Sequence, residues 1–231
     1  MMILTNDDGI DAPGIRALQR SLSLIQSASR SVIVAPAGHY SGCSHQVTTH
    51  RPIAIQQRAE GEYAIAGTPA DCTRIALSHL APDTNWVLSG VNAGGNLGTD
   101  VYISGTVAAV REAVLHRVPG IALSHMIRRG MPIDWEYATQ QTARVLEKLM
   151  ALPLEPGSFW NVNLPPLTLA DPEPELVFCP LCTQPLPLEF VLEDDAWRYA
   201  GEYPKRDRDP QADVDVCFSG NIAITKIKLW N

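Results

Sequence analysis

The sequence has few cysteines, and those it has do not suggest a disulfide-stabilised fold. Its 231 residues include five cysteines at scattered positions, so we expect free thiols rather than a disulfide framework. The only close pair, Cys179-Pro-Leu-Cys182, has no second CxxC and no histidine cluster near it. We therefore interpret this pair as structural and predict neither a zinc nor a redox site there.

Long apolar runs and export signals are also missing. No stretch approaches the roughly 18 apolar residues of a membrane-spanning helix, and the N-terminus lacks a basic region followed by a long apolar core. The Walker A and GxGxxG motifs, internal repeats and low-complexity tracts are absent as well. The expectation is a cytoplasmic globular protein with no membrane partner.

Positive charge is scarce. The chain has 18 Lys and Arg against 25 Asp and Glu, a formal net charge of -7. This balance argues against a broad electrostatic surface for nucleic acid or an anionic membrane. Any anionic substrate must be bound by groups close to it.

Short apolar runs alternate with helical patterns along most of the chain, whose hydrophobic content is 45%. The predicted strands are 2–5, 32–35, 86–89, 121–124 and 160–164, and the predicted helices are 13–22, 69–80, 106–116 and 135–150. The alternation indicates the α/β class, with a mostly parallel sheet in a Rossmann-like three-layer fold. Apolar pieces at 53–55 and 63–66 predict a hairpin with a turn near Gly61.

The composition changes after Met150, where prolines become frequent from 153 to 187. We therefore expect a catalytic core over 1–150 and a C-terminal extension over 151–231 that completes the sheet. The final run, 221–229, alternates apolar and polar residues, which suits a strand in this sheet or in a partner's sheet.

The most informative stretch is Ile3-Leu4-Thr5-Asn6-Asp7-Asp8-Gly9. Two adjacent carboxylates at the end of a buried strand repel each other and lose hydration, so they call for a cation. Pro13 and the apolar positions Ile15, Leu18 and Leu22 predict that a helix follows. The acids are therefore expected in a strand-to-helix loop that binds a divalent metal ion.

Ligands of an open parallel sheet bind outside the carboxyl ends of its strands. The loop after the second predicted strand, 37–42, offers a hydroxyl group, and the loop after the third, 89–98, offers an amide oxygen. Together with the two acids these groups form an all-oxygen ligand set. Such a set suits Mg²⁺, Mn²⁺ or Ca²⁺ and does not suit zinc.

The third loop is also rich in glycine and ends at a helix start. It leads into Ser104-Gly105-Thr106, where free backbone amides and small hydroxyl residues can bind a phosphate without net positive charge. Its glycines are Gly90, Gly94, Gly95 and Gly98, followed by Gly105. Beside the acid pair, this pattern favours phosphate binding.

Several long motifs in order resemble the SurE (survival protein E) family of nucleotidases. They are ILTNDDGIDAPGI, APAGHYSGCSH, GTPADC, SGVNAGGNLGTDVYISGTVAAVREA and VPGIALS, which cover residues 2 to 125, with weaker similarity at WNVNLP and DVD near the C-terminus. The chain departs from the family at 37–40, where many members carry mixed charges, and at Ala113, where glycine is common.

The resemblance implies particular roles for site residues. The implied metal ligands are Asp7, Asp8, Ser41 and Asn92, and the implied phosphate pocket is Asn96, Ser104, Gly105 and Thr106, with Asp7, Asp8 and Asn96 as the catalytic set. It also implies one divalent cation per subunit, Mg²⁺ or Mn²⁺. With the strand-like C-terminus, it implies a homodimer or homotetramer.

The expected function is hydrolysis of nucleoside 5′-monophosphates to nucleoside and phosphate by a metal-dependent phosphatase, with 3′-monophosphates and short polyphosphate as further substrates. A phosphatase with an aspartyl nucleophile would need an acid where Gly9 stands. The alternatives are a receiver-type signalling module, for which no fitting acceptor aspartate and lysine pair appears, and a non-enzymatic metal- and nucleotide-binding protein.

Other polar residues have weaker signals. His39 and His45 flank Ser41, and either is a candidate to act as a general acid or to hold a phosphate oxygen. Glu112 is interpreted as a structural residue. The charged run 205–209 is predicted to be a solvated loop, with an arm that reaches a partner's site as the alternative.

Overall fold

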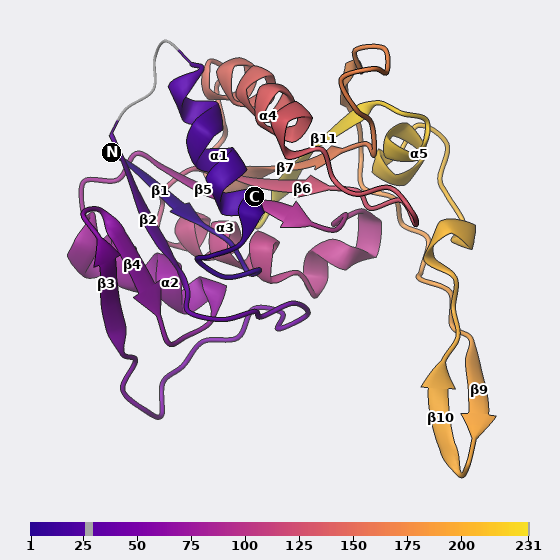
Figure 1. Cartoon of the computed structure of the whole chain (residues 1–231), viewed down its shortest axis with the longest axis horizontal. Coiled ribbons are helices and arrows are strands. Elements are labelled where there is room, and N and C mark those ends of the chain that lie inside the picture. Colours follow the sequence, from indigo (N-terminus) through magenta and orange to yellow (C-terminus); the bar gives the residue numbers. More distant parts are fainter. Residues whose placement is uncertain (26–29, 231) are drawn as a thin grey trace.

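The computed structural model describes residues 1–25 and 30–230, which form a central sheet with helices on both faces (Figure 1). The strands of this sheet are β1 (Met2–Thr5), β2 (Ser31–Pro36), β3 (Ile55–Ala59), β4 (Glu62–Ile65), β5 (Trp86–Ala93), β6 (Gly120–His125), β7 (Ser158–Leu164), β8 (Leu176–Phe178) and β11 (Ile222–Lys228). The helices are α1 (Pro13–Ser23), α2 (Pro69–Ile75), α3 (Gly105–Leu115), α4 (Trp135–Met150) and α5 (Asp213–Phe218).

The sheet order is β3-β4-β2-β1-β5-β6-β7-β11-β8. Neighbours from β4 to β7 are parallel, whereas β3 is antiparallel to β4 and β11 is antiparallel to β7. Helices α1 and α4 cover one face, and α2 and α3 cover the other (Figure 1). This arrangement confirms the α/β, Rossmann-like three-layer prediction.

Apolar burial explains why these elements form where the sequence predicts them. On α1, Ile15, Leu18 and Leu22 face the sheet and are almost fully buried, as their helical spacing requires. Helix α2 begins with a capping box in which Thr68 accepts a hydrogen bond from the Asp71 amide and Asp71 accepts one from the Thr68 amide. All five predicted strands and all four predicted helices are present.

Two details differ from the prediction. Strand β3 runs over Ile55–Ala59 rather than over 53–55, because it is an exposed edge strand with no buried face to fill. The helix predicted at 69–80 is α-helical only to Ile75 and continues as a π-helix over Ala76–Leu80. The C-terminal run, predicted as a strand of this sheet or of a partner's sheet, is β11 of this chain's own sheet, between β7 and β8, which confirms the first alternative.

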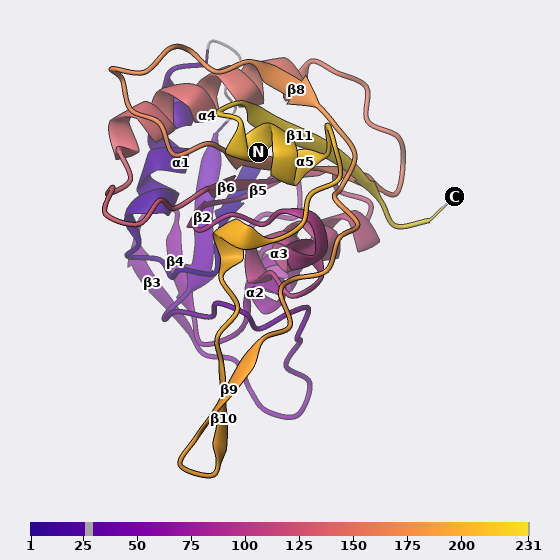
Figure 2. The same cartoon turned by 90° about the vertical axis from the view of Figure 1, so that its right-hand side faces the viewer.

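A second, two-stranded unit stands apart from the sheet. Strands β9 (Phe190–Glu193) and β10 (Ala196–Tyr199) form a hairpin that projects from the body, as both views show (Figures 1 and 2). It exposes large apolar side chains, among them Leu192 and Trp197. Within the described residues no helix combines the length and apolar character needed to cross a bilayer.

The chain order of the strands places a topological switch point at the carboxyl end of β1. Strand β1 lies between β2, which follows it along the chain, and β5, which is reached only after β2, β3 and β4 have been added on the other side. Connections therefore leave β1 and β5 in opposite directions, the arrangement in which open α/β sheets bind ligands. The loop with Asp7 and Asp8 follows β1 directly.

The first turn of helix α1 packs so closely against β5 that only glycine fits at position 14. A Cβ atom on Gly14 would lie 1.9 Å from the carbonyl oxygen of Val91 in β5. We expect G14A to lower the free energy of unfolding by about 1–3 kcal/mol, because backbone must move to admit the methyl group. Urea denaturation checks this value, with G38A as the control, since a Cβ on Gly38 meets no atom within 4 Å. A G14A protein as stable as G38A would contradict the close packing.

Candidate functional site

The acid pair lies in a short loop closed by Asn6. The Asn6 side chain donates to the Gly9 carbonyl (2.8 Å) and accepts from the Gly9 amide (3.2 Å), so it bridges the chain across the two acids. Asp7 is 3% exposed, and the Asp8 side chain is 12% exposed. The loop therefore presents one buried and one accessible carboxylate.

Helix α3 starts directly against Asp7. The Thr106 hydroxyl donates a hydrogen bond to Asp7 Oδ1, and a Cβ on Gly105 would lie 2.8 Å from Asp7 Cβ. The first amides of an α-helix have no partner within the helix, and its N-terminus carries partial positive charge. Glycine at 105 thus allows a favourable helix end to sit beside the acid.

No lysine or arginine forms an ion pair with Asp7 or Asp8 within the described chain. The nearest basic group is His39, whose Nδ1 lies 3.6 Å from Asp8 Oδ1, while the Ala93 amide donates to Asp8 Oδ2 at 3.0 Å. Burial raises the pKa of Asp7 to about 6; the Thr106 hydrogen bond opposes this rise and the charge of Asp8 adds to it. The pair thus has more negative charge than its protein surroundings balance.

Two other loops reach the acid pair, one next to Ser41 and the other next to Asn92. The Tyr40 amide donates to the Asp7 carbonyl at 2.8 Å, which brings the loop after β2 alongside, with Ser41 exposed next to Tyr40. Asn92 is 7% exposed on β5 and donates its amide to the Gly94 carbonyl at 2.8 Å. That bond uses the nitrogen of Asn92 and leaves its side-chain oxygen available.

These donors fit a hard cation. The described residues contain no group of three or more His, Cys, Asp or Glu side chains able to hold a metal, so a thiolate- or histidine-rich site is not present among them. Two carboxylates, a hydroxyl and an amide oxygen match the preference of Mg²⁺ and Mn²⁺. The excess negative charge at Asp7 and Asp8 supplies the electrostatic reason for binding one.

The predicted phosphate residues divide between two positions. Gly105 and Thr106 contact Asp7, and Ser104 caps α3 by accepting from the Val107 amide at 3.1 Å. Asn96 is 7% exposed and donates its side-chain amide to Ser124 Oγ at 2.7 Å. Asn96 therefore has no hydrogen bond to either acid, and it is held from the β6 side of the loop.

A buried asparagine network below Asn96 was missed by sequence reasoning. The backbone amide of Asn96 donates to Asn163 Oδ1 (2.7 Å), and the backbone carbonyl of Asn96 accepts from the side-chain amides of Asn161 (2.9 Å) and Asn163 (3.0 Å). Both asparagines lie in β7 and are fully buried. Their i, i+2 spacing in an otherwise apolar strand was the available signal, since such residues share one face of a sheet.

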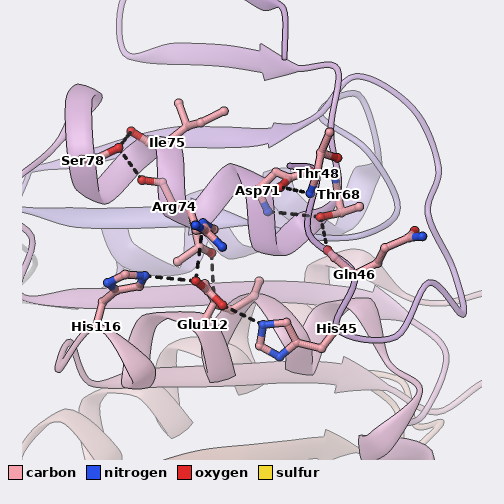
Figure 3. Close-up of polar contacts among 12 residues, drawn as sticks. His45, Gln46, Thr48, Thr68, Asp71, Arg74, Ile75, Ser78, Glu112 and His116 are labelled. Carbon is pink, nitrogen blue, oxygen red and sulfur yellow. Dashed lines mark hydrogen bonds and ion pairs between the residues drawn. The ribbon is translucent and has the colours of Figure 1, made fainter. Parts of the chain in front are cut away.

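Glu112 and His45 form a second polar cluster, drawn in Figure 3. His45 Nε2 lies 2.7 Å from Glu112 Oε2, and His116 Nε2 lies 3.0 Å from Glu112 Oε1, with Arg74 at 3.8 Å. The Glu112 side chain is only 6% exposed. His45 is thus paired with α3, whereas His39 is the histidine that lies beside the acids.

The same segment is held from α2. The Thr48 amide donates to Asp71 Oδ1 (2.8 Å), and the Thr68 hydroxyl donates to the Gln46 carbonyl (2.6 Å), as Figure 3 shows. With the His45 contact, these bonds fix residues 45–48 against two helices. The loop that carries Ser41 thus has a firm anchor although it contains no regular structure.

The charged run 205–209 was predicted to be solvated, and this is wrong for Arg206. The Arg206 side chain is fully buried and donates to Asp100 Oδ2 at 3.0 Å, and Asp100 also accepts from the Tyr203 hydroxyl. A buried arginine needs such a partner. The contact attaches the C-terminal segment to the loop between Asn96 and Ser104, which local sequence cannot reveal because the partners are 106 residues apart.

Comparisons with known proteins agree with this geometry. The family described as survival protein SurE matches residues 2–185. A relative from Nostoc sp. strain PCC 7120, which carries a provisional 5′-nucleotidase name, is 58% identical over 99% of both chains. A 5′-nucleotidase SurE from Moorella thermoacetica is 35% identical over 99% of this chain and 90% of its own. The crystal structure of the SurE protein from Aquifex aeolicus has a TM-score of 0.86 at 27% identity and covers 100% of this chain and 94% of its own.

The Glu112 cluster generates a prediction about stability and pH. Burial favours the neutral acid, but the hydrogen bonds with His45 and His116 and the charge of Arg74 outweigh it and hold the pKa of Glu112 below its ordinary value of 4.5. The ionised form of Glu112 therefore stabilises the folded state at pH values above 4.5, its ordinary pKa. This stabilisation is lost as the pH falls below 4.5 and through the lower pKa that Glu112 has in the folded protein. We expect E112Q to cost about 1–3 kcal/mol near pH 7 and less near pH 3.5.

Urea denaturation at both pH values measures the difference. E147Q is the matched control, because Glu147 is exposed on α4 and its replacement is expected to change stability little. An E112Q penalty that stays the same at both pH values would show that the charge of Glu112 contributes nothing.

Proposed function

The chain belongs to the survival protein SurE family, and we propose that it is a metal-dependent 5′-nucleotidase that hydrolyses nucleoside 5′-monophosphates to nucleoside and phosphate. The strongest support for the proposal is the position of the acid pair. The buried Asp7 and the more accessible Asp8, neither of which has a lysine or arginine partner among the described residues, lie at the switch point of the sheet, and the N-terminus of α3 begins against Asp7. The relatives named 5′-nucleotidase support the same activity.

Asp7, Asp8, Ser41 and Asn92 would hold one divalent cation per subunit, Mg²⁺ or Mn²⁺. When bound, the cation polarises the phosphoryl group and lowers the pKa of a water molecule. The buried position of Asp7 and the Ala93 amide on Asp8 orient the two carboxylates before substrate arrives.

The substrate phosphate would bind between this centre and the start of α3. The amides of Gly105 and Thr106, with the Ser104 hydroxyl, provide donors for the phosphoryl oxygens and stabilise their charge as the reaction proceeds. Asn96 would add a further donor from the β5 loop. Phosphate binding then needs no lysine or arginine.

The reaction transfers the phosphoryl group to water in line. The water oxygen forms a bond to phosphorus, the bond from phosphorus to the sugar oxygen breaks, and the sugar oxygen takes a proton to leave as the nucleoside. Asp8 is the more accessible acid, so we assign it the orientation of the water and assign Asp7 mainly to cation binding. No covalent intermediate is needed.

The proposal extends to further substrates, to the cellular location and to assembly. We propose that 3′-monophosphates and short polyphosphate are additional substrates and that the protein acts in the cytoplasm as a homodimer or homotetramer. The exposed apolar residues of the β9–β10 hairpin support association with another copy. Light scattering tests the assembly, and a monomeric mass would contradict it.

Replacing Asp8 tests the proposed chemistry. We expect D8A to reduce metal-dependent phosphate release from a nucleoside 5′-monophosphate to below about one-hundredth of the wild-type rate, because cation binding and water orientation are both lost. Circular dichroism should show an unchanged fold. D11A is the matched control, since Asp11 is exposed three residues further along the same loop, and it should retain activity.

Phosphate release is measured with Mg²⁺, Mn²⁺ and Zn²⁺ in turn and after chelation. Full activity of D8A, or activity that survives chelation, would contradict the metal-dependent mechanism. Binding of nucleotide with no turnover under any metal would instead indicate a non-enzymatic nucleotide-binding protein.

A further inference from the structure

A cleft of about 360 Å³ opens beside the candidate site, at the carboxyl ends of β6 and β7. Met126, Arg128 and Arg129 follow β6 and form one part of its lining, Leu167 follows β7, and Phe218 of α5 faces them. Its volume lies within the roughly 300–1,000 Å³ of typical small-molecule sites. None of the residues proposed to bind the metal or the phosphate lines this cleft.

The cleft is continuous with the loop that carries Asn92 and Asn96. The Gly94 amide donates to the His125 carbonyl at 3.0 Å, one residue before Met126. A Cβ on Gly95 would lie 3.2 Å from Met126 Sδ. Met126 thus lies against Gly95 of the loop that carries Asn92 and Asn96, and it also lines the cleft. The loop and the cleft are therefore neighbours.

A second cleft lies at the opposite edge of the sheet. A cleft of about 300 Å³ is lined by Pro119, Gly157 and Ser158, which lie where β6 and β7 begin. That cleft is at the amino ends of the strands, whereas Asp7, Asp8 and the start of α3 lie at the carboxyl ends. Only the first cleft therefore shares an edge of the sheet with the acid pair.

The lining combines apolar side chains with two arginines, which suits a planar heteroaromatic group. Met126 and Leu167 provide apolar walls. The guanidinium carbon of Arg208 lies over the Phe218 ring, 4.2 Å from the ring centre. Arg128 and Arg129 are exposed and border the cleft. Guanidinium groups stack on aromatic rings and donate hydrogen bonds to ring nitrogens and carbonyl oxygens.

We propose that this cleft binds the nucleobase of the substrate and that Arg128 and Arg129 determine its affinity. The inference rests on the proposed 5′-nucleotidase function, since it takes the phosphate of the same substrate to lie near Asp7. It assigns phosphate binding and base binding to separate groups of residues. The base site is built by the loops after β6 and β7 and by α5, and the phosphate site by the loops after β1, β2 and β5.

Removing the arginines should weaken binding of the base without weakening binding of phosphate. For R128A and R129A we expect the inhibition constant of the free nucleoside to rise about fivefold or more, with KM for the nucleoside 5′-monophosphate rising and kcat nearly unchanged. The inhibition constant of inorganic phosphate should stay within about twofold. R58A is the matched control, because it removes one positive charge from β3 at the far edge of the sheet.

A second variant tests the cleft without changing charge. L167W places a larger side chain in the cleft and should raise the inhibition constant of the nucleoside in the same way. Thermal unfolding of each variant checks that the fold is retained. Nucleoside inhibition that is unchanged in R128A, R129A and L167W would overturn the proposal, as would equal weakening of nucleoside and phosphate binding.

The wild-type protein separates this inference from the function on which it rests. Phosphate release from nucleoside 5′-monophosphates tests the function, and the ratio of the two inhibition constants tests the base site. Wild-type turnover with an unchanged ratio in the variants rejects only the base site. Absence of wild-type turnover rejects the function.

Discussion

The burial of Asp7 beside Asp8 is the constraint on which the rest of the carboxyl edge depends. A carboxylate loses hydration when it is buried, and a second acid next to it adds repulsion. The fold compensates with the Thr106 hydroxyl, the N-terminus of α3 and a set of oxygen donors suited to a cation. Glycine at 105 is required because a side chain there would displace Asp7.

The loops that surround this pair have no regular structure of their own, so other elements must hold them. Contacts from Glu112 and Asp71 fix the segment after Ser41 to α3 and α2. On the other side, Asn163 and the buried Arg206–Asp100 pair hold the loop between Asn96 and Ser104. These contacts keep the site ordered at the cost of burying several polar groups, and the Nε and Nη2 atoms of Arg206 are buried without a hydrogen-bond partner in the described part of the chain.

Much of the fold was predictable because burial leaves a local pattern. Apolar runs marked the strands, helical spacing marked α1, and Thr68-Pro69 marked the start of α2. The exposed edge strand β3 was displaced by a few residues, since a strand without a buried face has no such pattern. The acid pair and the glycine-rich loop were recognisable for a similar reason, because each is unusual at the end of an apolar run.

The sequence alone determined the α/β class and the order of the main elements, and it indicated the residues that we propose for metal and phosphate binding, since these depend on the identity and spacing of nearby residues. Only the tertiary structure decided that His45 pairs with Glu112, that Arg206 is buried against Asp100, and that the loops after β6 and β7 form a cleft with Phe218 of α5. These contacts join residues far apart along the chain. Their energy depends on burial and distance, which exist only once the sheet has brought the strand ends together.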